Sequence, residues 1–145
     1  MEGTIVAICL SEAKGTPKKA VSSVRLKVDH GLENDAHAGN WHRQVSLLSY
    51  GKVEEFNQKG AMVGHGAFGE NILVGGLDLR QLPVGTRLAI GQALLEVTQI
   101  GKECHSRCQI YDRVGDCIMP REGIFAKVLA EGEVKPGDSV IALAQ

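Results

Sequence analysis

Three of the four cysteines of this chain lie in one short segment, GKECHSRCQIYDRVGDC, residues 101–117. Grouped thiols can hold a metal ion, form disulfides, pack in a core or react as nucleophiles. The spacing Cys104-x3-Cys108-x8-Cys117, with His105 nearby, fits a zinc or iron–sulfur site loosely. Structural metal sites usually have a second ligand pair at tight spacing, and here that second pair is missing. A metal-binding module therefore stays an alternative rather than the first interpretation.

Cys104 has the surroundings of a reactive thiol. It follows the apolar run LLEVTQI, so a loop would hold it at the end of a strand on a rigid scaffold. Lys102, His105 and Arg107 lie within three positions, and only Glu103 opposes them. Positive neighbours stabilise the thiolate, which is the nucleophile and the form that takes up persulfide sulfur. The local pattern fits a loop cysteine without a chemical task equally well.

Length and charge narrow the classes of function. A chain of 145 residues with 43% apolar and 23% charged residues is expected to form one globular domain, residues 1–145. A net charge of −1 argues against a general nucleic-acid or membrane-surface role. No segment reaches the roughly 18 apolar residues of a membrane span, and the run IVAICL is too short for a signal peptide. We therefore expect a cytoplasmic protein with reduced thiols, in which Cys9 and Cys117 are apolar core residues.

Short β-branched runs dominate the rest of the sequence and predict a mainly β domain with closed edges. The expected strands are Thr4–Leu10, Val24–Asp29, Arg43–Ser49, Asn71–Val74, Arg87–Ile90 and Ala93–Ile100. Gly91-Gln92 between the last two predicts a type II′ hairpin turn. The basic stretch KGTPKKAV, residues 14–21, is predicted to be a solvated loop between strands.

Two segments are predicted to be helices. YGKVEEFNQKG has Val53 and Phe56 at helical spacing and a glycine stop at its end. PREGIFAKVLAEG, residues 120–132, has an apolar stripe, a proline suited to the first turn and a terminal glycine.

The order of motifs resembles the MOSC domain, the family named for the C-terminal domain of molybdenum-cofactor sulfurase. The resemblance spans residues 4–142 and rests on GLENDAHAGNWHRQVSLLS, then GAFGENILVGGLDLRQLPVGTRLAIGQALLEVTQ, then a cysteine, then GIFAKVLAEGEVKPGD. Cys104, seven residues after Val97, matches the characteristic cysteine of the family. Where the family commonly reads Gly-Leu-Glu-Gly-Asp, this chain has GLEND, and Asn34 is expected to accept a positive φ there.

The resemblance implies a fold and a chemistry. The fold would be mainly β with two or three helices, a closed β-barrel of the type also seen as the insert domain of pyruvate kinase. Cys104 would take persulfide sulfur from a separate, pyridoxal-phosphate-dependent cysteine desulfurase and pass it to a metal–sulfur centre of an acceptor protein. In other members the domain holds molybdenum cofactor (molybdopterin) with this cysteine as the molybdenum ligand. A sulfur transferase, a carrier that reacts once per loading and a non-covalent pterin-binding escort protein all fit the resemblance.

Polar residues before one predicted strand suit the mouth of a pocket for an anionic ligand. They are Asp35, His37, Asn40, His42 and Arg43 in ENDAHAGNWHRQ. The alternative is a polar loop whose side chains bond their own backbone. The i,i+5 spacing of the two histidines disfavours a shared metal ion, because it fits neither a helix face nor a strand face.

Two further contributions complete the predicted binding site. A pterin phosphate would favour Arg43 and Arg121 as bidentate partners. Asn71, the last residue of the glycine-containing stretch GHGAFGEN, would line the same pocket, since glycine lets backbone amides approach an anion closely. A plain glycine turn explains that stretch equally well.

Overall fold

The structure is a computed structural model that describes residues 2–11, 18–36, 38–58, 70–101 and 123–143. Its elements, in chain order, are β1 (Glu2–Leu10), β2 (Lys19–Val21), β3 (Val24–Lys27), β4 (Gly31–Leu32), β5 (Val45–Ser49), α1 (Tyr50–Gln58), β6 (Ile72–Gly75), the 3₁₀ turn η1 (Leu79–Gln81), β7 (Arg87–Ile90), β8 (Ala93–Ile100), β9 (Ile124–Ala130), β10 (Gly132–Val134) and β11 (Ser139–Ala142).

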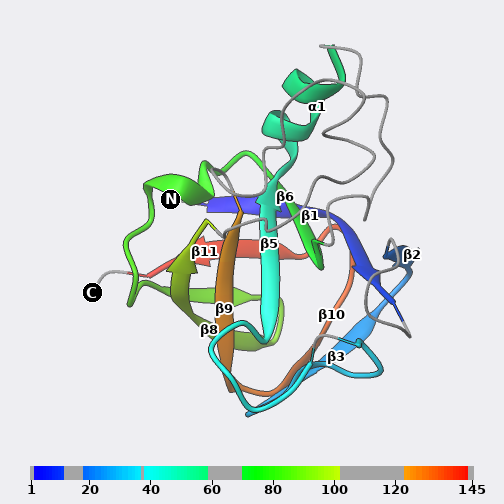
Figure 1. Ribbon diagram of the computed structural model, residues 1–145, viewed down its shortest axis with the longest axis vertical. Coiled ribbons are helices and arrows are strands. Elements are labelled where there is room, and N and C mark those ends of the chain that lie inside the picture. Colours follow the sequence, from blue (N-terminus) through cyan, green and yellow to red (C-terminus); the bar gives the residue numbers. More distant parts are fainter. Residues whose placement is uncertain (1, 12–17, 37, 59–69, 102–122, 144–145) are drawn as a thin grey trace, which may run out of the picture.

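The main sheet closes on itself as a seven-stranded barrel. Its order is β11-β7-β8-β9-β5-β6-β1, with β2 extending the far end of β1, and the pairing of β11 with β1 completes the ring. All neighbours in the ring are antiparallel except β5 and β6, which run parallel. Figure 1 shows β1 and β11 crossing the barrel beside each other, with α1 beyond the end of β5. A smaller sheet, β10-β3-β4, covers one side. The mainly β, closed-barrel prediction is confirmed.

Alternation of apolar and polar residues puts one face of each strand into the barrel. On β8 the inward residues are Ala93, Leu95 and Val97, and all three are buried. The core also takes in large aliphatic side chains from the second sheet, including Leu26 of β3 and Leu32 of β4. This single cluster reaches from β1 to β11.

The hairpin prediction is confirmed in register and turn type. Ile90 pairs with Ala93, so Gly91 and Gln92 form the two-residue turn. Gly91 has a φ of 54° and Gln92 does not have a positive φ, which is the type II′ pattern. The helix predicted to follow β5 is also confirmed, as α1, with Val53 buried against the barrel.

The helix predicted over residues 120–132 is wrong for its described part, where β9 and the start of β10 are strands. β9 lies between β5 and β8 in the sheet. Ile124, Ala126 and Val128 belong to the core, and Phe125 on the opposite face is buried as well. A strand buried on both faces loses the alternation that separates a strand from a helix. Gly132 is glycine because a Cβ there would lie 2.5 Å from the carbonyl carbon of Gln92, not because a helix ends.

One α-helix and one 3₁₀ turn are present among the described residues, against an expectation of two or three helices. In this part of the chain no helix combines the length and the apolar character needed to cross a bilayer.

Candidate functional site

Four strands place their residues side by side at one level of the barrel. Asn71, immediately before β6, donates its backbone N–H to the carbonyl of Ser46 on β5 at 2.9 Å. Ser46 pairs with Phe125 on β9, and Phe125 pairs with Gln99 on β8. The loop 33–44 is attached to both ends of this row, through Asp35 at the β6 end and through His42 at the β8 end.

At the β6 end, Asp35 is the centre of a buried cluster that we call the Asp35 anchor: Asp35, Lys18, Ser11 and Asn71. Its Oδ1 accepts from Lys18 Nζ at 2.6 Å and from the backbone N–H of Ser11 at 3.1 Å. Its Oδ2 accepts from Asn71 Nδ2 at 3.2 Å. The side chains of Lys18 and Asp35 are 1% and 0% exposed. A single carboxylate thus joins the segments around residues 11, 18 and 71.

Asn71 uses the remaining atoms of its amide inside the same cluster. Its Oδ1 accepts from the backbone N–H of Ser46 at 3.0 Å and from the Ser46 hydroxyl at 3.2 Å, and its Nδ2 also donates to the Cys9 carbonyl at 3.1 Å. Asp35 and Asn71, two of the predicted ligand-binding residues, are therefore brought together but buried and fully bonded. Their contact with a ligand stays a prediction, and their geometry is that of residues that hold the loop in place.

The solvated-loop prediction for residues 14–21 is wrong at Lys18, which is only 3% exposed. An unpaired ammonium would not be buried, and the Asp35 carboxylate neutralises it. No sequence spacing indicates this pair, because the two residues meet only once β1 and the loop 33–44 are in place.

Cys9 lies beside this anchor and is confirmed as a core residue, since it is 0% exposed. Burial raises the pKa of its thiol to about 12, and the Glu70 carboxylate adds to the rise while Lys18 opposes it. A protonated buried thiol is a poor nucleophile, so Cys9 is not a candidate for sulfur chemistry.

This raised pKa predicts a loss of stability in alkali. In the native state the Cys9 thiol keeps its proton up to a pKa of about 12, whereas in the unfolded state it releases the proton above a pKa of 9.0. Its contribution to the free energy of unfolding is therefore complete below pH 9 and decreases as the pH rises towards about 12. The loss should approach about 1.4 kcal/mol per pH unit within that window. Urea unfolding at pH 8, 9 and 10 should show a shallower decline for Cys9→Ala than for the wild type. Parallel declines would contradict the assignment.

At the β8 end the strand carries a bulge that turns its side chains towards the loop. Val97 pairs with Ala126 and Gln99 with Phe125, which leaves Thr98 as the extra residue. The Thr98 hydroxyl is placed to bond the carbonyls of both His42 and Phe125. Bulges commonly re-aim side chains next to functional sites.

The side chain of Gln99, the residue that follows the bulge, holds the His42 ring in place by a hydrogen bond. Its Nε2 donates to the Gly101 carbonyl at 2.8 Å, which leaves Oε1 facing His42 Nε2 at 2.9 Å. A carbonyl oxygen can only accept, so His42 Nε2 carries the proton and, in the neutral ring, Nδ1 is left as an acceptor. His42, a predicted site residue, is exposed in this position.

Arg43 lies between two aromatic rings. Its guanidinium carbon is 5.2 Å from the ring centroid of Trp41 and 5.4 Å from that of Phe125. Its Nε is buried and has no hydrogen-bond partner. None of the ion pairs formed among the described residues involves Arg43. We call Trp41, His42, Arg43, Gln99 and Phe125 the Arg43 cluster.

Gly101 and Gly123 stand next to this cluster. The Gly101 N–H donates to the Gly123 carbonyl at 2.6 Å, so the chain leaves β8 and returns to β9 at one point. Between them lie the predicted residues outside the described part of the chain: Lys102, Cys104, His105, Arg107, Cys108, Cys117 and Arg121. His37 is likewise outside it. Within the described ranges, no group of three or more His, Cys, Asp or Glu side chains could hold a metal ion.

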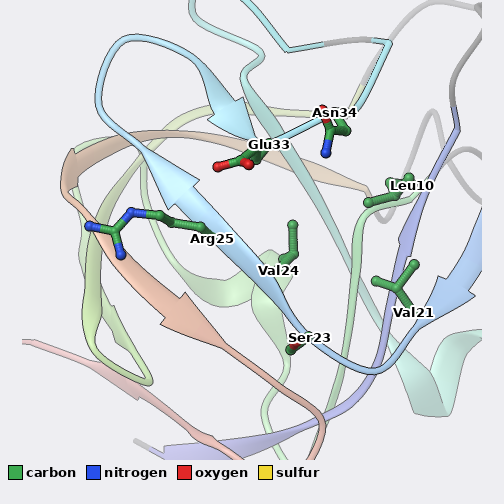
Figure 2. Close-up of a pocket in the computed structure, with 7 residues that line it drawn as sticks. All are labelled: Leu10, Val21, Ser23, Val24, Arg25, Glu33 and Asn34. Carbon is green, nitrogen blue, oxygen red and sulfur yellow. The ribbon is translucent and has the colours of Figure 1, made fainter.

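A cavity of about 590 Å³ is lined by residues of β1, β2 and β3 and by the segment that follows β4. Its lining residues are Leu10, Val21, Ser23, Val24, Arg25, Glu33 and Asn34. Figure 2 shows Val24, Val21 and Leu10 close together, with Asn34 above Leu10 and the Arg25 guanidinium directed away from them. Asn34 has a φ of 68°, which confirms that it takes the left-handed conformation.

Sequence reasoning found the loop 33–44 and Asn71 but missed Trp41, Gln99 and Phe125 as parts of the cluster. Trp41 could have been noticed as the one tryptophan of the chain, two residues before a predicted anion-binding arginine. Gln99 and Phe125 gave no such signal, because only the bulge and the strand pairing bring them to Arg43.

Solved structures share this architecture. The YuaD protein from Bacillus subtilis superposes with a TM-score of 0.82 at 19% identity, over 100% of this chain and 98% of that one. YiiM from Geobacillus stearothermophilus gives 0.71 at 20%, over 98% of this chain and 75% of its own. YiiM from Escherichia coli gives 0.69 at 20%, over 100% of this chain and 71% of its own.

Sequence comparison with curated proteins gives no significant match. The model of the MOSC domain, a family associated with molybdenum-cofactor binding or sulfur handling, matches residues 34–141. That match covers well over half of the chain, including β5 to β10 and the β8–β9 junction, so the chain belongs to the MOSC domain family.

Proposed function

We propose that this protein carries sulfur, or handles molybdenum cofactor, through Cys104. The observation that carries the proposal is Arg43: a half-buried guanidinium with an unpaired Nε and no carboxylate partner among the described residues. A buried donor without a partner costs about 1–3 kcal/mol. Such a cost is typical of a site that is completed by a ligand.

The position of Arg43 relates it to the cysteine segment. Gln99 joins His42 to Gly101, and Gly101 is three residues before Cys104 in the sequence. Three residues of chain span at most about 11 Å, so Cys104 is tethered within that distance of Gly101. A thiolate in this region would also be favoured by Lys102, His105 and Arg107.

In the sulfur-carrier reaction, the donor is a cysteine desulfurase whose own pyridoxal phosphate has produced an enzyme persulfide. The Cys104 thiolate attacks the outer sulfur of that persulfide. A new S–S bond forms on Cys104, the S–S bond on the desulfurase breaks, and the desulfurase cysteine leaves as its thiolate. Sulfur is transferred without net oxidation. A thiolate of the metal–sulfur acceptor protein would discharge Cys104 by the same type of attack, which leaves the persulfide on the acceptor and Cys104 as its thiolate.

Molybdenum cofactor can be tested against the residues present. The unpaired Nε of Arg43 and the planar donor set of its guanidinium fit the phosphate of a pterin cofactor, with Arg121 as a second candidate. Asp35 and Asn71 would hold the loop that carries Arg43, and His37 and His42 would border the ligand. When bound, the cofactor would supply a molybdenum centre, with Cys104 as its thiolate ligand.

Intact mass spectrometry after incubation with a cysteine desulfurase and cysteine tests the sulfur-carrier reaction. We expect the wild type to gain the mass of one sulfur atom, lost again on reduction, and Cys104→Ala to gain none. Cys108→Ala is the matched control, because it removes a neighbouring thiol and should still be loaded. No addition to the wild type, or equal addition to Cys104→Ala, would exclude the carrier role.

A further inference from the structure

We infer that the outer face of the barrel around β11 is an interface through which two copies of this chain form a two-fold symmetric dimer, with Glu2 of one copy opposite Arg87 of the other. Figure 1 shows both chain ends on this side of the barrel, near β11. The dimer does not depend on Cys104, and it leaves the Arg43 cluster of each copy outside the contact.

The outward positions of β11, β7 and β8 carry an apolar patch, which we call the β11 patch: Ile141, Leu143, Ala89 and Leu94. Strand pairing places Ile141 opposite Ala89 and Ala89 opposite Leu94, so these side chains form one row across the sheet. Leu143 lies on the same face two residues after Ile141, and its backbone N–H donates to the Arg87 carbonyl at 2.9 Å. Ile141 and Leu143 are 36% and 40% exposed. The outward face of an antiparallel sheet is normally polar, and a contiguous apolar patch there marks an interaction surface.

Two charged residues flank the β11 patch. Glu2 of β1 lies directly opposite Ile141, and Arg87 of β7 lies on the other side of β11. Both are exposed, and within the described ranges neither forms an ion pair. Glu96 faces Arg87 across the β7–β8 pair, but its carboxylate is bound to Lys127 at 3.4 Å. The patch therefore has an acid on one side and a base on the other.

This arrangement of charges is self-complementary. In a two-fold dimer both copies use the same surface, so a residue that contacts a second residue of the partner is contacted by that residue in return. With the axis in the plane of the patch between Glu2 and Arg87, each Glu2 faces the Arg87 of the other copy. Two ion pairs then border an apolar centre, which is the usual composition of an interface. A different protein would have to supply the same acid and base in reverse order, whereas a second copy supplies them by symmetry.

The size of this face predicts a weak dimer. Five neighbouring strands, from β1 through β11, β7 and β8 to β9, lie about 4.8 Å apart and span about 19 Å. Faces of this size belong to small, reversible interfaces rather than to obligate ones. The dimer should therefore form and dissociate within an accessible range of concentration.

Sedimentation equilibrium of the full chain, from low micromolar to near-millimolar concentration and with a reductant present, tests the inference. The wild type should rise from the mass of one chain to that of two. Leu143→Lys should raise the dissociation constant about tenfold or more, because it places an ammonium beside Arg87 within the apolar centre. Val28→Lys is the matched control: Val28 is also 40% exposed, but it lies between β3 and β4, outside the patch. It should dimerise as the wild type does.

A charge exchange tests the two-fold arrangement itself. Glu2→Arg alone and Arg87→Glu alone should each raise the dissociation constant about tenfold, because each sets like charges opposite one another twice in the dimer. The double variant should return it close to the wild-type value, since acid and base are exchanged but still opposite. Both positions are exposed, and unfolding midpoints measured by circular dichroism verify that every variant is folded.

Three results overturn the inference. They are a wild type that stays at the mass of one chain over the whole series, a Leu143→Lys variant that dimerises as the wild type does, and a double variant no tighter than the two single ones. Weaker association of the single variants with recovery in the double variant supports it, because only contact between Glu2 and Arg87 of different copies links the two charges in this way.

Discussion

Replacing Asp35 by alanine is expected to lower the free energy of unfolding by about 3–5 kcal/mol, the usual cost of leaving a buried charge unpaired. The Lys18 ammonium, with its side chain 1% exposed, would lose its carboxylate and could not reach water without moving the start of β2. The backbone N–H of Ser11 and the amide of Asn71 would lose an acceptor as well. Urea unfolding followed by circular dichroism measures the loss.

Two controls define what the pair contributes. Glu96→Gln breaks the more exposed pair with Lys127, where the two side chains are 26% and 44% exposed, and should cost less than about 1 kcal/mol. The double replacement Lys18→Met with Asp35→Leu should recover part of the loss, because no charge is then buried. An effect of Asp35→Ala no larger than that of Glu96→Gln would show that the Asp35 anchor is not a main source of stability.

Gly31→Ala is expected to cost about 2–4 kcal/mol and to displace the loop that carries the Arg43 cluster. Gly31 has a φ of 116°, and a Cβ there would lie 2.4 Å from the carbonyl oxygen of Gln44. Both the left-handed backbone and the overlap oppose a side chain, so β4 and the Gln44 backbone would have to separate. Gln44 in turn accepts the backbone N–H of Val128 with its side chain at 3.0 Å, so the shift would reach β9.

Gly137→Ala is the matched control for Gly31→Ala. Gly137 also has a positive φ, 96°, but a Cβ there would meet nothing within 4 Å. It should therefore show only the backbone cost of about 1–2 kcal/mol. Emission of Trp41, the one tryptophan of the chain, should shift in Gly31→Ala and stay unchanged in Gly137→Ala. Equal losses of stability in the two variants would refute the role given to the close approach at Gln44.

Local sequence signals predicted the elements whose structure is set locally. The Gly91-Gln92 turn and α1 depend on neighbouring residues, and both are present as predicted. The segment 124–130 was mistaken for a helix because it is largely buried on both faces, and that burial depends on residues far away in the chain. The pairing of Lys18 with Asp35 was missed for the same reason.

For the candidate site, the sequence indicated the polar loop 33–44 but not that its polar residues have different roles. Asp35 and Arg43 are only eight residues apart and looked equivalent as polar residues before a strand. The structure neutralises and buries Asp35, while Arg43 keeps an unpaired donor between two rings. This difference arises from Lys18 and Phe125, which the loop meets only after the barrel has closed.

The pairing that closes the barrel also constrains when it can form. Glu2 of β1 lies opposite Ile141 of β11, a separation of 139 residues, the difference of their two numbers. During synthesis on a ribosome, this edge of β1 must wait for nearly the whole chain to emerge, while its other neighbour, β6, appears about halfway through. Contacts of such long range make folding slow, and a waiting strand edge can pair with other chains. The newly made protein therefore keeps one edge of β1 open to pairing with other chains until β11 appears.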